Sequence, residues 1–355
     1  MTGNNPVVNI NIVVLNGEKY IRHCLDAVLK QTFEHGRIGF NILDNGSDDK
    51  TQEIIKEYLP RFSNFHHTEF IKSSHNLGMW GGHEKFWLRS QATYEVTLSV
   101  DVIMEDNFVK HAVAVLDKDP KVGALQAKIY QFDIDDIAAG KDLNKDRIDT
   151  CGFRIFRSRK IGNIGHGEVD RGQFDNPKEI FGVEGAVPVF RRSALMSIKV
   201  LGEIADRDLF WYGEDLDVAW RIRLAGWKEI YDPTVIAWHD RGTTKSHAHG
   251  GLLNHLARVP LRHKISIKKR RLEWRNTRWT RVKNDYIINI LKDLPYIFLR
   301  EAEILGYTIL FEPGVLAEVP RFIKGLPKMF RKRRQILKQT KVSSKQIHAY
   351  FLPND

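Results

Sequence analysis

Hydrophobic runs alternate with helical patterns over the first hundred residues of this chain. Three of the runs are each followed within a few residues by an acidic or amide side chain: Ile38–Leu43 by Asp44, Glu69–Lys72 by Asn76, and Glu95–Val100 by Asp101. Strands that alternate with helices predict an α/β fold with a parallel, doubly wound sheet. Because ligands of such sheets bind beyond the carboxyl ends of the strands, the three side chains predict a binding site at one edge of the sheet.

Local patterns of the same kind predict the remaining elements. A first strand is expected over Val7–Leu15, after which Glu18 opens a helix. Further along we expect a helix over Phe108–Leu116, a strand over Val122–Phe132, regular structure over Phe181–Arg191 and over Asp208–Gly226, and a strand over Thr234–His239. The polar segment Asp133–Asp175 is expected to form loops and short antiparallel strands beside a cleft.

The length of 355 residues exceeds that of a typical domain of about 100 to 200 residues, so we expect one large unit and an appendage, divided after residue 245. Cys24 and Cys151 are too few for a disulfide framework, which favours a reducing cytoplasm. No basic segment precedes the first apolar run, and no run approaches about 18 apolar residues. We therefore expect neither a signal peptide nor an integral span.

Basic residues are concentrated in the last third of the chain. Residues 241–355 carry 25 Lys and Arg against 8 Asp and Glu, whereas residues 1–240 carry 30 against 36. Basic clusters at Lys264–Arg281 and Arg331–Arg334 are interleaved with the apolar segments Tyr286–Leu299 and Ile304–Phe311. Such interleaving is typical of helices on an anionic membrane surface, where each cation contributes about 1 kcal/mol. We expect residues 246–355 to be helical and the protein to be peripheral on the inner face of the cell membrane.

Two other interpretations of the basic region stay open. Nucleic acid is one, but the region shows no helix-turn-helix or zinc-finger spacing, and the acidic front part of the chain would repel a phosphate backbone. We therefore do not expect nucleic acid as a partner. The other is that these helices are solvated and pack on the main domain.

The residues after the second and third strands suit a nucleotide. Asp44, Asn45 and Ser47 offer a carboxylate, an amide and a hydroxyl, which match the hydrogen-bonding face of a pyrimidine base and its ribose; the alternative is a cap of the next helix. Asn76 and Gly78 precede a helix whose start would favour a negatively charged ligand, and a tight turn is the alternative. Neither a Gly-x-Gly-x-x-Gly fingerprint nor a Gly-x-x-x-x-Gly-Lys loop is found, which disfavours a dinucleotide enzyme, an ATPase or a kinase of those classes.

Asp101 ends a buried run and presents a carboxylate at the sheet edge. A hard divalent cation binds through one or two carboxylates together with phosphate oxygens of its substrate. His239 ends the later run Val235–His239 and could bring a neutral imidazole to the same ion, although a structural histidine is the alternative. We interpret the edge of the sheet as a site for a nucleoside diphosphate and a metal ion.

The segment from Trp211 to Trp227 reads as a helix with acidic residues at its start and basic residues near its end. Glu214 and Asp215 lie at the start among aromatic residues. A carboxylate in such a place can accept a proton from a hydroxyl group, and a helix end matched to its dipole is the alternative.

The ordered series of these motifs resembles glycosyltransferase family 2, of the GT-A fold, and most closely its bacterial rhamnosyltransferase-like branch. The resemblance covers roughly residues 7 to 245. It is carried by Asn16, Asp44-Asn45-Gly46-Ser47-Asp48, Asn76-Leu77-Gly78, Ser99-Val100-Asp101, Gly185-Ala186, Gly213-Glu214-Asp215-Leu216-Asp217 and Trp238-His239. Where the family has Asp-x-Asp, this chain has Ser99-Val100-Asp101 and lacks the first carboxylate.

The resemblance implies an inverting transfer of a sugar, such as rhamnose or a related hexose, from a dTDP- or UDP-linked donor to a hydroxyl of a glycan or lipid-linked acceptor. It implies Mg²⁺ or Mn²⁺ held by Asp101 and His239, and Asp215 as general base with Glu214 beside it. It assigns the donor to Asn16, Glu18, Asp44, Asn45, Ser47, Asn76, Gly78 and Asp101, and the acceptor side to Gly185, Ala186 and Trp211.

Two hypotheses from other classes stay open. A sugar-nucleotide nucleotidyltransferase would carry a Gly-rich basic phosphate loop after the first strand, which Asn16–Lys19 matches poorly. A non-catalytic, membrane-recruited binding protein would tolerate loss of Asp215. The sequence does not reveal the donor sugar, the acceptor or the oligomeric state, and it is compatible with a homo-oligomer.

Overall fold

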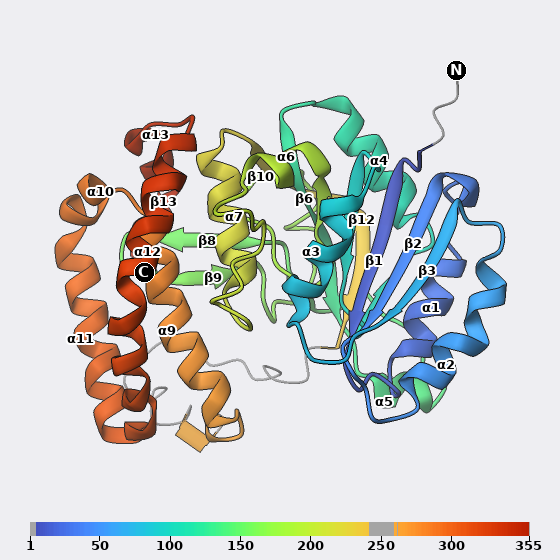
Figure 1. The fold of residues 1–355 in the computed structure, drawn as a ribbon, viewed down its shortest axis with the longest axis horizontal. Coiled ribbons are helices and arrows are strands. Elements are labelled where there is room, and N and C mark those ends of the chain that lie inside the picture. Colours follow the sequence, from blue (N-terminus) through green and yellow to red (C-terminus); the bar gives the residue numbers. More distant parts are fainter. Residues whose placement is uncertain (1–4, 241–258, 261, 355) are drawn as a thin grey trace.

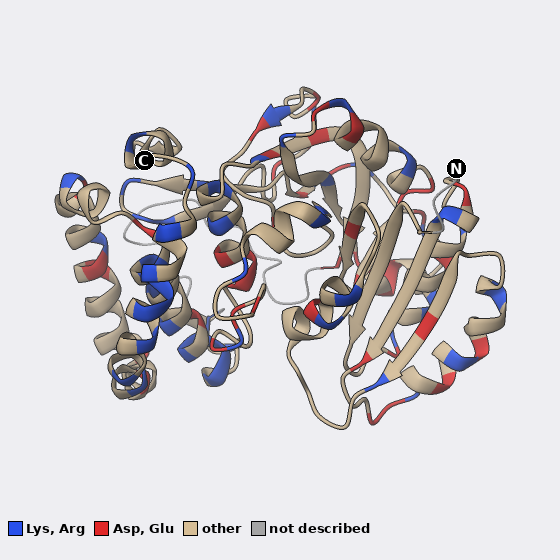
Figure 2. Cartoon of the chain, turned by 45° about the horizontal axis from the view of Figure 1, so that its top comes forward, with Lys and Arg blue, Asp and Glu red and all other residues tan. Residues whose placement is uncertain are grey.

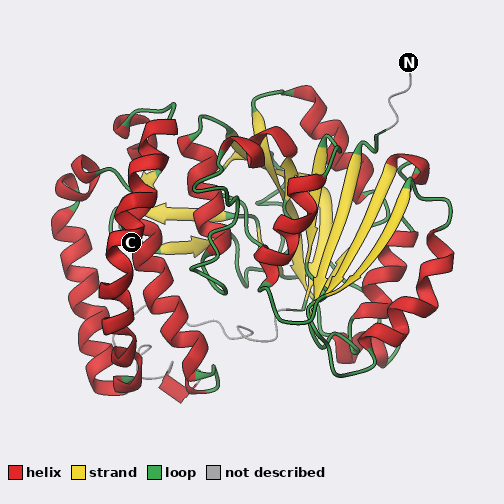
Figure 3. Cartoon of the chain, in the orientation of Figure 1, coloured by secondary structure: helices red, strands yellow, loops and turns green. Residues whose placement is uncertain are grey.

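The computed structural model describes residues 5–240, 259–260 and 262–354. A central sheet covered by helices makes up the larger part of the molecule, and long helices from the last third of the chain lie beside it (Figure 1). Figure 3 shows that strands and helices alternate in the sheet-containing part, as the sequence predicts. The fold is of the α/β class with a helical C-terminal region.

Within the described residues the main sheet has ten strands. Eight of them follow one another in the order β10-β12-β6-β11-β4-β1-β2-β3, while β5 pairs with β12 and β7 with β6. Their bounds are β1 Val8–Val14, β2 Ile38–Asp44, β3 His67–Lys72, β4 Tyr94–Leu98, β5 Val102–Met104, β6 Val122–Gln131, β7 Ile148–Thr150, β10 Lys178–Glu179, β11 Val189–Arg191 and β12 Lys228–His239. Strands β1 to β4 pair in parallel, as do β6 and β12, and β11 runs antiparallel between β4 and β6. The predicted mostly parallel sheet is confirmed, and antiparallel strands such as β11 make it mixed.

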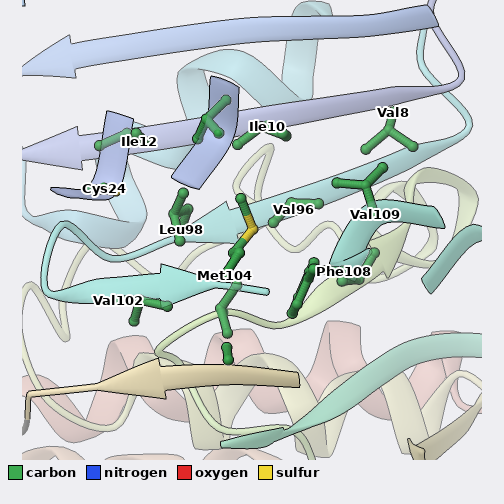
Figure 4. Packing of buried hydrophobic residues seen from close by; sticks show 14 of the residues in the cluster. Val8, Ile10, Ile12, Cys24, Val96, Leu98, Val102, Met104, Phe108 and Val109 are labelled. Atoms are coloured by element: carbon green, nitrogen blue, oxygen red, sulfur yellow. The ribbon is translucent and has the colours of Figure 1, made fainter. Parts of the chain in front are cut away.

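Helices connect the strands and cover the sheet. They are α1 Ile21–Leu29, α2 Thr51–Tyr58, α3 Met79–Arg89, α4 Phe108–Lys118, α5 Ile134–Ala138, α6 Arg192–Ser197 and α7 Glu214–Leu224, with short 3-10 turns at His35–Arg37 and Leu59–Phe62. Strands β1 and β2 are buried at every residue, as expected for parallel strands covered on both faces. In Figure 4, Val8, Ile10 and Ile12 of β1 lie near Val96 and Leu98 of β4 in this core.

Buried amide side chains link three neighbouring strands. Asn41 Nδ2 on β2 donates to Asn11 Oδ1 on β1 at 2.8 Å, and Asn11 Nδ2 donates to Glu95 Oε2 on β4 at 2.8 Å. Since a buried polar group without a partner is costly, these bonds favour one register of β2, β1 and β4. In that register Val14 lies opposite Asp44, so the carboxyl ends of β1 and β2 meet at one edge of the sheet.

Two local predictions have different outcomes. The segment from Asp133 to Asp175 forms short antiparallel strands, as expected: β7 pairs with β6, and β8 (Phe153–Phe156) pairs with β9 (Ile161–Asn163). The helix expected from Trp211 is wrong at its start, because α7 begins only at Glu214. Phe210 and Tyr212 have φ angles of 60° and 71°, which a right-handed helix does not allow. Residues 208–213 are therefore a loop.

The C-terminal helices pack against the sheet-containing part through buried ion pairs. These helices are α9 Ile267–Asn284, α10 Ile287–Lys292, α11 Leu294–Phe311, α12 Val319–Gln339 and α13 Ser344–His348, with a 3-10 segment at Pro313–Glu318. Lys283 of α9 pairs with Asp206 and with Asp217 of α7, and Lys332 of α12 also pairs with Asp206. The last strand, β13 Phe351–Leu352, pairs with β8.

Lys283 and Lys332 of the basic region therefore serve packing on the main domain, which was the alternative interpretation. The division expected after residue 245 lies outside the described residues. Among the described helices, none has both the length and the apolar content that a membrane span requires.

Candidate active site

The loops that follow β1 and β2 are joined by hydrogen bonds. The backbone N–H of Asn16 donates to Ser47 Oγ at 2.8 Å, and the N–H of Asp48 donates to Asn16 Oδ1 at 3.0 Å. One residue pair further out, Glu18 Oε2 accepts from the N–H of Lys50 at 3.3 Å. The structure thus brings Asn16, Glu18 and Ser47 together at the carboxyl edge of the sheet.

Asp44 and Asn45 stabilise the loops around them. The buried carboxylate of Asp44 accepts from the N–H groups of Gly46 and Ser47 and from Gln52 Nε2, the last at 2.7 Å. These bonds close the loop after β2 and do not cap α2, which begins at Thr51 and has no side-chain cap bond at Lys50. Asn45 accepts from the N–H of Leu77 and donates to the carbonyl of Gly78, both at 3.2 Å, so it ties the loop after β2 to the loop after β3.

Gly78 allows a close contact that another residue would prevent. Its φ angle is +76°, and a Cβ atom at this position would lie 2.5 Å from the carbonyl oxygen of Phe210. The N–H of Gly78 donates to Asn76 Oδ1 at 2.7 Å, which sets the turn before α3. The loop after β3 therefore packs directly against the loop that precedes α7.

Asp101 and His239 meet at the ends of β4 and β12. His239 Nε2 lies 3.5 Å from Asp101 Oδ2, and the N–H of Asp240 donates to the carbonyl of Asp101 at 3.0 Å. On the other side of the ring, His239 Nδ1 lies 2.9 Å from Asp149 Oδ2. The carboxylate of Asp149 is fully buried and orients the imidazole so that Nε2 faces Asp101.

The protonation of this pair follows from its surroundings. Burial lowers the pKa of His239, but Asp101 and Asp149 outweigh that effect and raise it to about 10. Burial raises the pKa of Asp101, but the His239 imidazolium and the Ser99 hydroxyl outweigh that effect and lower it. A divalent cation held by Asp101 and His239 would require the neutral form of the imidazole, so metal binding would compete with protonation of His239.

The described residues supply two candidate ligands rather than a complete metal cage. No group of three or more His, Cys, Asp or Glu side chains within the described ranges is arranged to hold a metal ion. Ions such as Mg²⁺ commonly complete their shell with water and substrate phosphate oxygens, so Asp101 and His239 fit a cation that binds together with a diphosphate.

Asp215 lies in the first turn of α7 and faces the same region. Its Oδ1 accepts from the N–H of Leu216 at 2.8 Å. A Cβ atom on Gly185 would lie 3.3 Å from Asp215 Oδ2, so this glycine lies directly against the carboxylate. The next residue, Ala186, accepts at its carbonyl from the N–H of Ser99 at 2.9 Å. Gly185 and Ala186 therefore connect Asp215 to the turn that carries Asp101.

Glu214, next to Asp215, is buried and has a raised pKa. Burial, and to a lesser extent Asp215 and Asp217, raise the pKa of Glu214 to about 8. Its Oε1 is buried and has no hydrogen-bond partner among the residues that the structure describes. Glu214 is therefore protonated near neutral pH. Trp211, in the loop before α7, is 42% exposed, and its ring lies 4.7 Å from that of Tyr212.

Sequence reasoning missed Asp149 and Asn276. Asn276 Nδ2 of α9 lies 2.8, 2.9 and 2.7 Å from the carbonyl oxygens of Leu209, Trp211 and Tyr212. The only local signals are one aspartate in a polar segment of unassigned structure and one asparagine inside a basic helix. Neither predicts a contact with an element so distant in the chain.

The matches to the curated relatives cover only part of each of those proteins. Glycosyltransferase AglE of Haloferax volcanii is 36% identical over 64 residues, which are 18% of this chain and 21% of AglE. Glucomannan 4-beta-mannosyltransferase 7 of Arabidopsis thaliana is 24% identical over 232 residues, which are 64% of this chain and 38% of that protein. The chain thus spans two fifths or less of the length of these two relatives.

Solved structures share the fold at low sequence identity. GalNAc-T7 with UDP, GalNAc and Mn²⁺ superposes with a TM-score of 0.62 at 14% identity, covering 98% of this chain and 56% of that one. The mannosyltransferase PcManGT from Pyrobaculum calidifontis, in complex with GDP-Man and Mn²⁺, gives 0.51 at 15% identity, covering 98% and 86%. S. aureus TarS 1–349 in complex with UDP gives 0.53 at 13% identity, covering 96% and 90%.

The family assignment comes from a sequence profile. The profile of "Glycosyl transferase family 2" matches residues 10–195, which is more than half of the chain and includes the loops after β1 to β4. The chain therefore belongs to glycosyltransferase family 2 and has a fold of the GT-A type.

Proposed function

We propose that this protein is an inverting, metal-dependent glycosyltransferase that moves a sugar from a nucleoside-diphosphate sugar to a hydroxyl group. The observation that carries the proposal is the convergence of the Asp101–His239 pair and Asp215 on one edge of the sheet, joined through Gly185 and Ala186. The ligands named for PcManGT and GalNAc-T7, a nucleotide or nucleotide sugar with Mn²⁺, support the same class of donor and ion.

In this proposal the loops after β1, β2 and β3 bind the nucleotide, and Asp101 and His239 hold Mg²⁺ or Mn²⁺. The bound cation would supply neutralisation of the charge that develops on the departing diphosphate. Asp149 keeps His239 in the orientation required, and a second carboxylate is not needed if phosphate oxygens complete the shell.

Asp215 acts as the general base. It accepts the proton of the acceptor hydroxyl while that oxygen attacks the anomeric carbon, and the bond from that carbon to the diphosphate oxygen breaks. The attack comes from the face opposite the leaving group, so one displacement inverts the configuration. Because Glu214 is protonated near neutral pH, it does not compete with Asp215 for the proton.

The proposed nucleotide, sugar and acceptor come from the resemblance of the sequence to the rhamnosyltransferase-like branch. We propose a dTDP- or UDP-linked donor, with rhamnose or a related hexose as the sugar, and a glycan or lipid-linked acceptor. The choice of nucleotide is supported by the family motif at Asp44, Asn45 and Ser47, at the edge of the sheet where the loops after β1 and β2 meet.

One experiment separates this proposal from its two rivals. The protein is incubated with a mixture of sugar nucleotides, Mn²⁺ and candidate acceptors, and the released products are identified. A glycosyltransferase releases nucleoside diphosphate, a sugar-nucleotide nucleotidyltransferase releases pyrophosphate, and a binding protein releases neither. Pyrophosphate alone, or no product with any donor and acceptor pair, contradicts the proposal.

A further inference from the structure

Helix α11 turns its apolar face outward. The residues on this face recur at helical spacing and carry no charge: Leu294, Pro295, Phe298, Leu299, Ala302, Leu305, Gly306, Ile309 and Leu310. Phe298 and Leu310 are each 72% exposed, and Leu299 is 62% exposed. A helix packed on a protein normally buries such a face, so this arrangement indicates a surface with an external partner.

The charged side chains of α11, Arg300, Glu301 and Glu303, line a cavity that α11 shares with α9. Glu301 accepts from Arg278 at 2.5 Å and from Arg281 at 2.7 Å, and both arginines belong to α9. The helix is therefore held in place by its polar side, and the apolar side is left uncovered by the described residues. The adjoining helix α10 extends the apolar surface with Ile287, Ile288 and Leu291, all about 60% exposed.

The surroundings of this surface are positively charged. Helix α12 carries eight Lys and Arg residues and no acidic residue, and six of its cations are exposed: Arg321, Lys324, Lys328, Arg331, Arg334 and Lys338. In Figure 2 the ribbon of the C-terminal helices is blue at many positions, which mark Lys and Arg, whereas α11, at the left edge, is mostly tan. Behind α11 a cavity of about 730 Å³ is lined by seven cations and four acidic residues.

We infer that the outer face of α10 and α11, defined by the apolar residues named above, docks on an anionic phospholipid bilayer. Apolar side chains that enter the boundary of the acyl chains, together with cations facing anionic headgroups, are the two contributions that hold an interfacial helix. A second copy of the chain fits less well, because a symmetric pair of these faces would also bring two basic regions together. This proposal does not depend on the transfer reaction.

The test uses the full chain and vesicles of phosphatidylcholine with or without phosphatidylglycerol. The variant Phe298→Glu/Ile309→Glu places two charges on the surface, and the control Leu88→Glu/Val169→Glu adds the same charges at exposed apolar residues elsewhere. We expect the wild type and the control to co-float with anionic vesicles and the first variant to lose at least about tenfold in partitioning. Thermal unfolding of all three proteins shows whether each is folded.

A second variant tests the choice of an anionic surface. Arg331→Gln/Arg334→Gln removes two exposed cations of α12 and is expected to weaken binding to anionic vesicles by roughly fivefold per cation.

Equal flotation of the wild type and Phe298→Glu/Ile309→Glu, or no flotation of the wild type, overturns the proposal. So does unchanged binding of Arg331→Gln/Arg334→Gln. A dimer in sedimentation velocity that Phe298→Glu/Ile309→Glu dissociates would identify a second copy as the partner and would also overturn it. The inner face of the cell membrane, as the location, stays a prediction of the sequence.

Discussion

The side-chain amide of Asn276 lies 2.7 Å from the carbonyl oxygen of Tyr212, so a helix of the C-terminal region holds the loop that leads to Asp215. Phe210 and Tyr212 in this loop have left-handed φ angles, which are unfavourable for residues other than glycine. The hydrogen bonds from Asn276 offset part of that strain. The C-terminal helices thus contribute to the geometry of the candidate base, although they lie outside the family match at residues 10–195.

Replacement of Asn276 by Ala should lower kcat at least about tenfold while the KM for the donor changes little. The variant leaves three loop carbonyls without this donor, at a cost of about 1 to 3 kcal/mol, and lets the start of α7 move. Steady-state kinetics and urea unfolding measure the two effects. The neighbouring Thr277→Ala is the control, since its hydroxyl bonds only within α9. Equal kcat values in the two variants would show that Asn276 does not position the loop.

Replacement of Gly78 by Ala should destabilise the protein and weaken nucleotide binding. The new Cβ would lie 2.5 Å from the Phe210 carbonyl, which forces the two loops apart. Gly140→Ala is a matched control, because Gly140 has a φ of +80° with nothing within 4 Å of its Cβ position. We expect Gly78→Ala to cost roughly 1 to 3 kcal/mol more than Gly140→Ala in unfolding free energy. Similar losses in both would mean that the close contact is unimportant.

Replacement of Asp149 by Asn should weaken Mn²⁺ binding about 10- to 100-fold in the presence of a nucleoside diphosphate. The amide oxygen of Asn can still accept a hydrogen bond from His239 Nδ1 but carries no negative charge, so it orients the ring less strongly and makes Nε2 a weaker ligand. Titration calorimetry with Mn²⁺ measures the affinity. Asp136→Asn, at an exposed ion pair with Lys141, is the control. An unchanged affinity in Asp149→Asn would argue against His239 as a ligand.

Replacement of Glu214 by Gln should change how stability depends on pH. The pKa of Glu214 is about 8 in the folded protein against 4.5 ordinarily, so the folded state binds more protons than the unfolded state between these values. The contribution of Glu214 to stability therefore decreases as pH rises from about 4.5 to 8. Urea midpoints at pH 5 and pH 8 should differ less in Glu214→Gln than in the wild type, whereas Glu53→Gln, an exposed residue of α2, should leave the difference intact. If the urea midpoints at pH 5 and pH 8 differ as much in Glu214→Gln as in the wild type, the buried, protonated state of Glu214 is contradicted.

Much of the sheet and its edge could be predicted from the sequence, because both follow from local patterns. The buried runs that end at Asp44 and Asp101 form parallel strands, and parallel strands place their carboxyl ends together. His239 could be placed for the same reason, as the last residue of another strand in the sheet.

The missed features depend on contacts between distant parts of the chain. Asn276 bonds to carbonyls 64 to 67 residues earlier, and Asp149 reaches His239 across 90 residues. The sequence also does not show which cations of the C-terminal region are buried and which are exposed. Lys283 and Lys332, for example, are buried against Asp206. Helical spacing identifies a face of a helix, but it does not say which partner that face meets.

The most direct test of the account is the turnover of Asp215→Asn compared with its affinity for the donor. The carboxamide cannot accept the proton of the acceptor, while the loops that bind the nucleotide are untouched. We predict that release of nucleoside diphosphate falls about 100-fold or more, whereas donor binding with Mn²⁺ stays within about twofold of wild type. Wild-type turnover in Asp215→Asn would contradict the account.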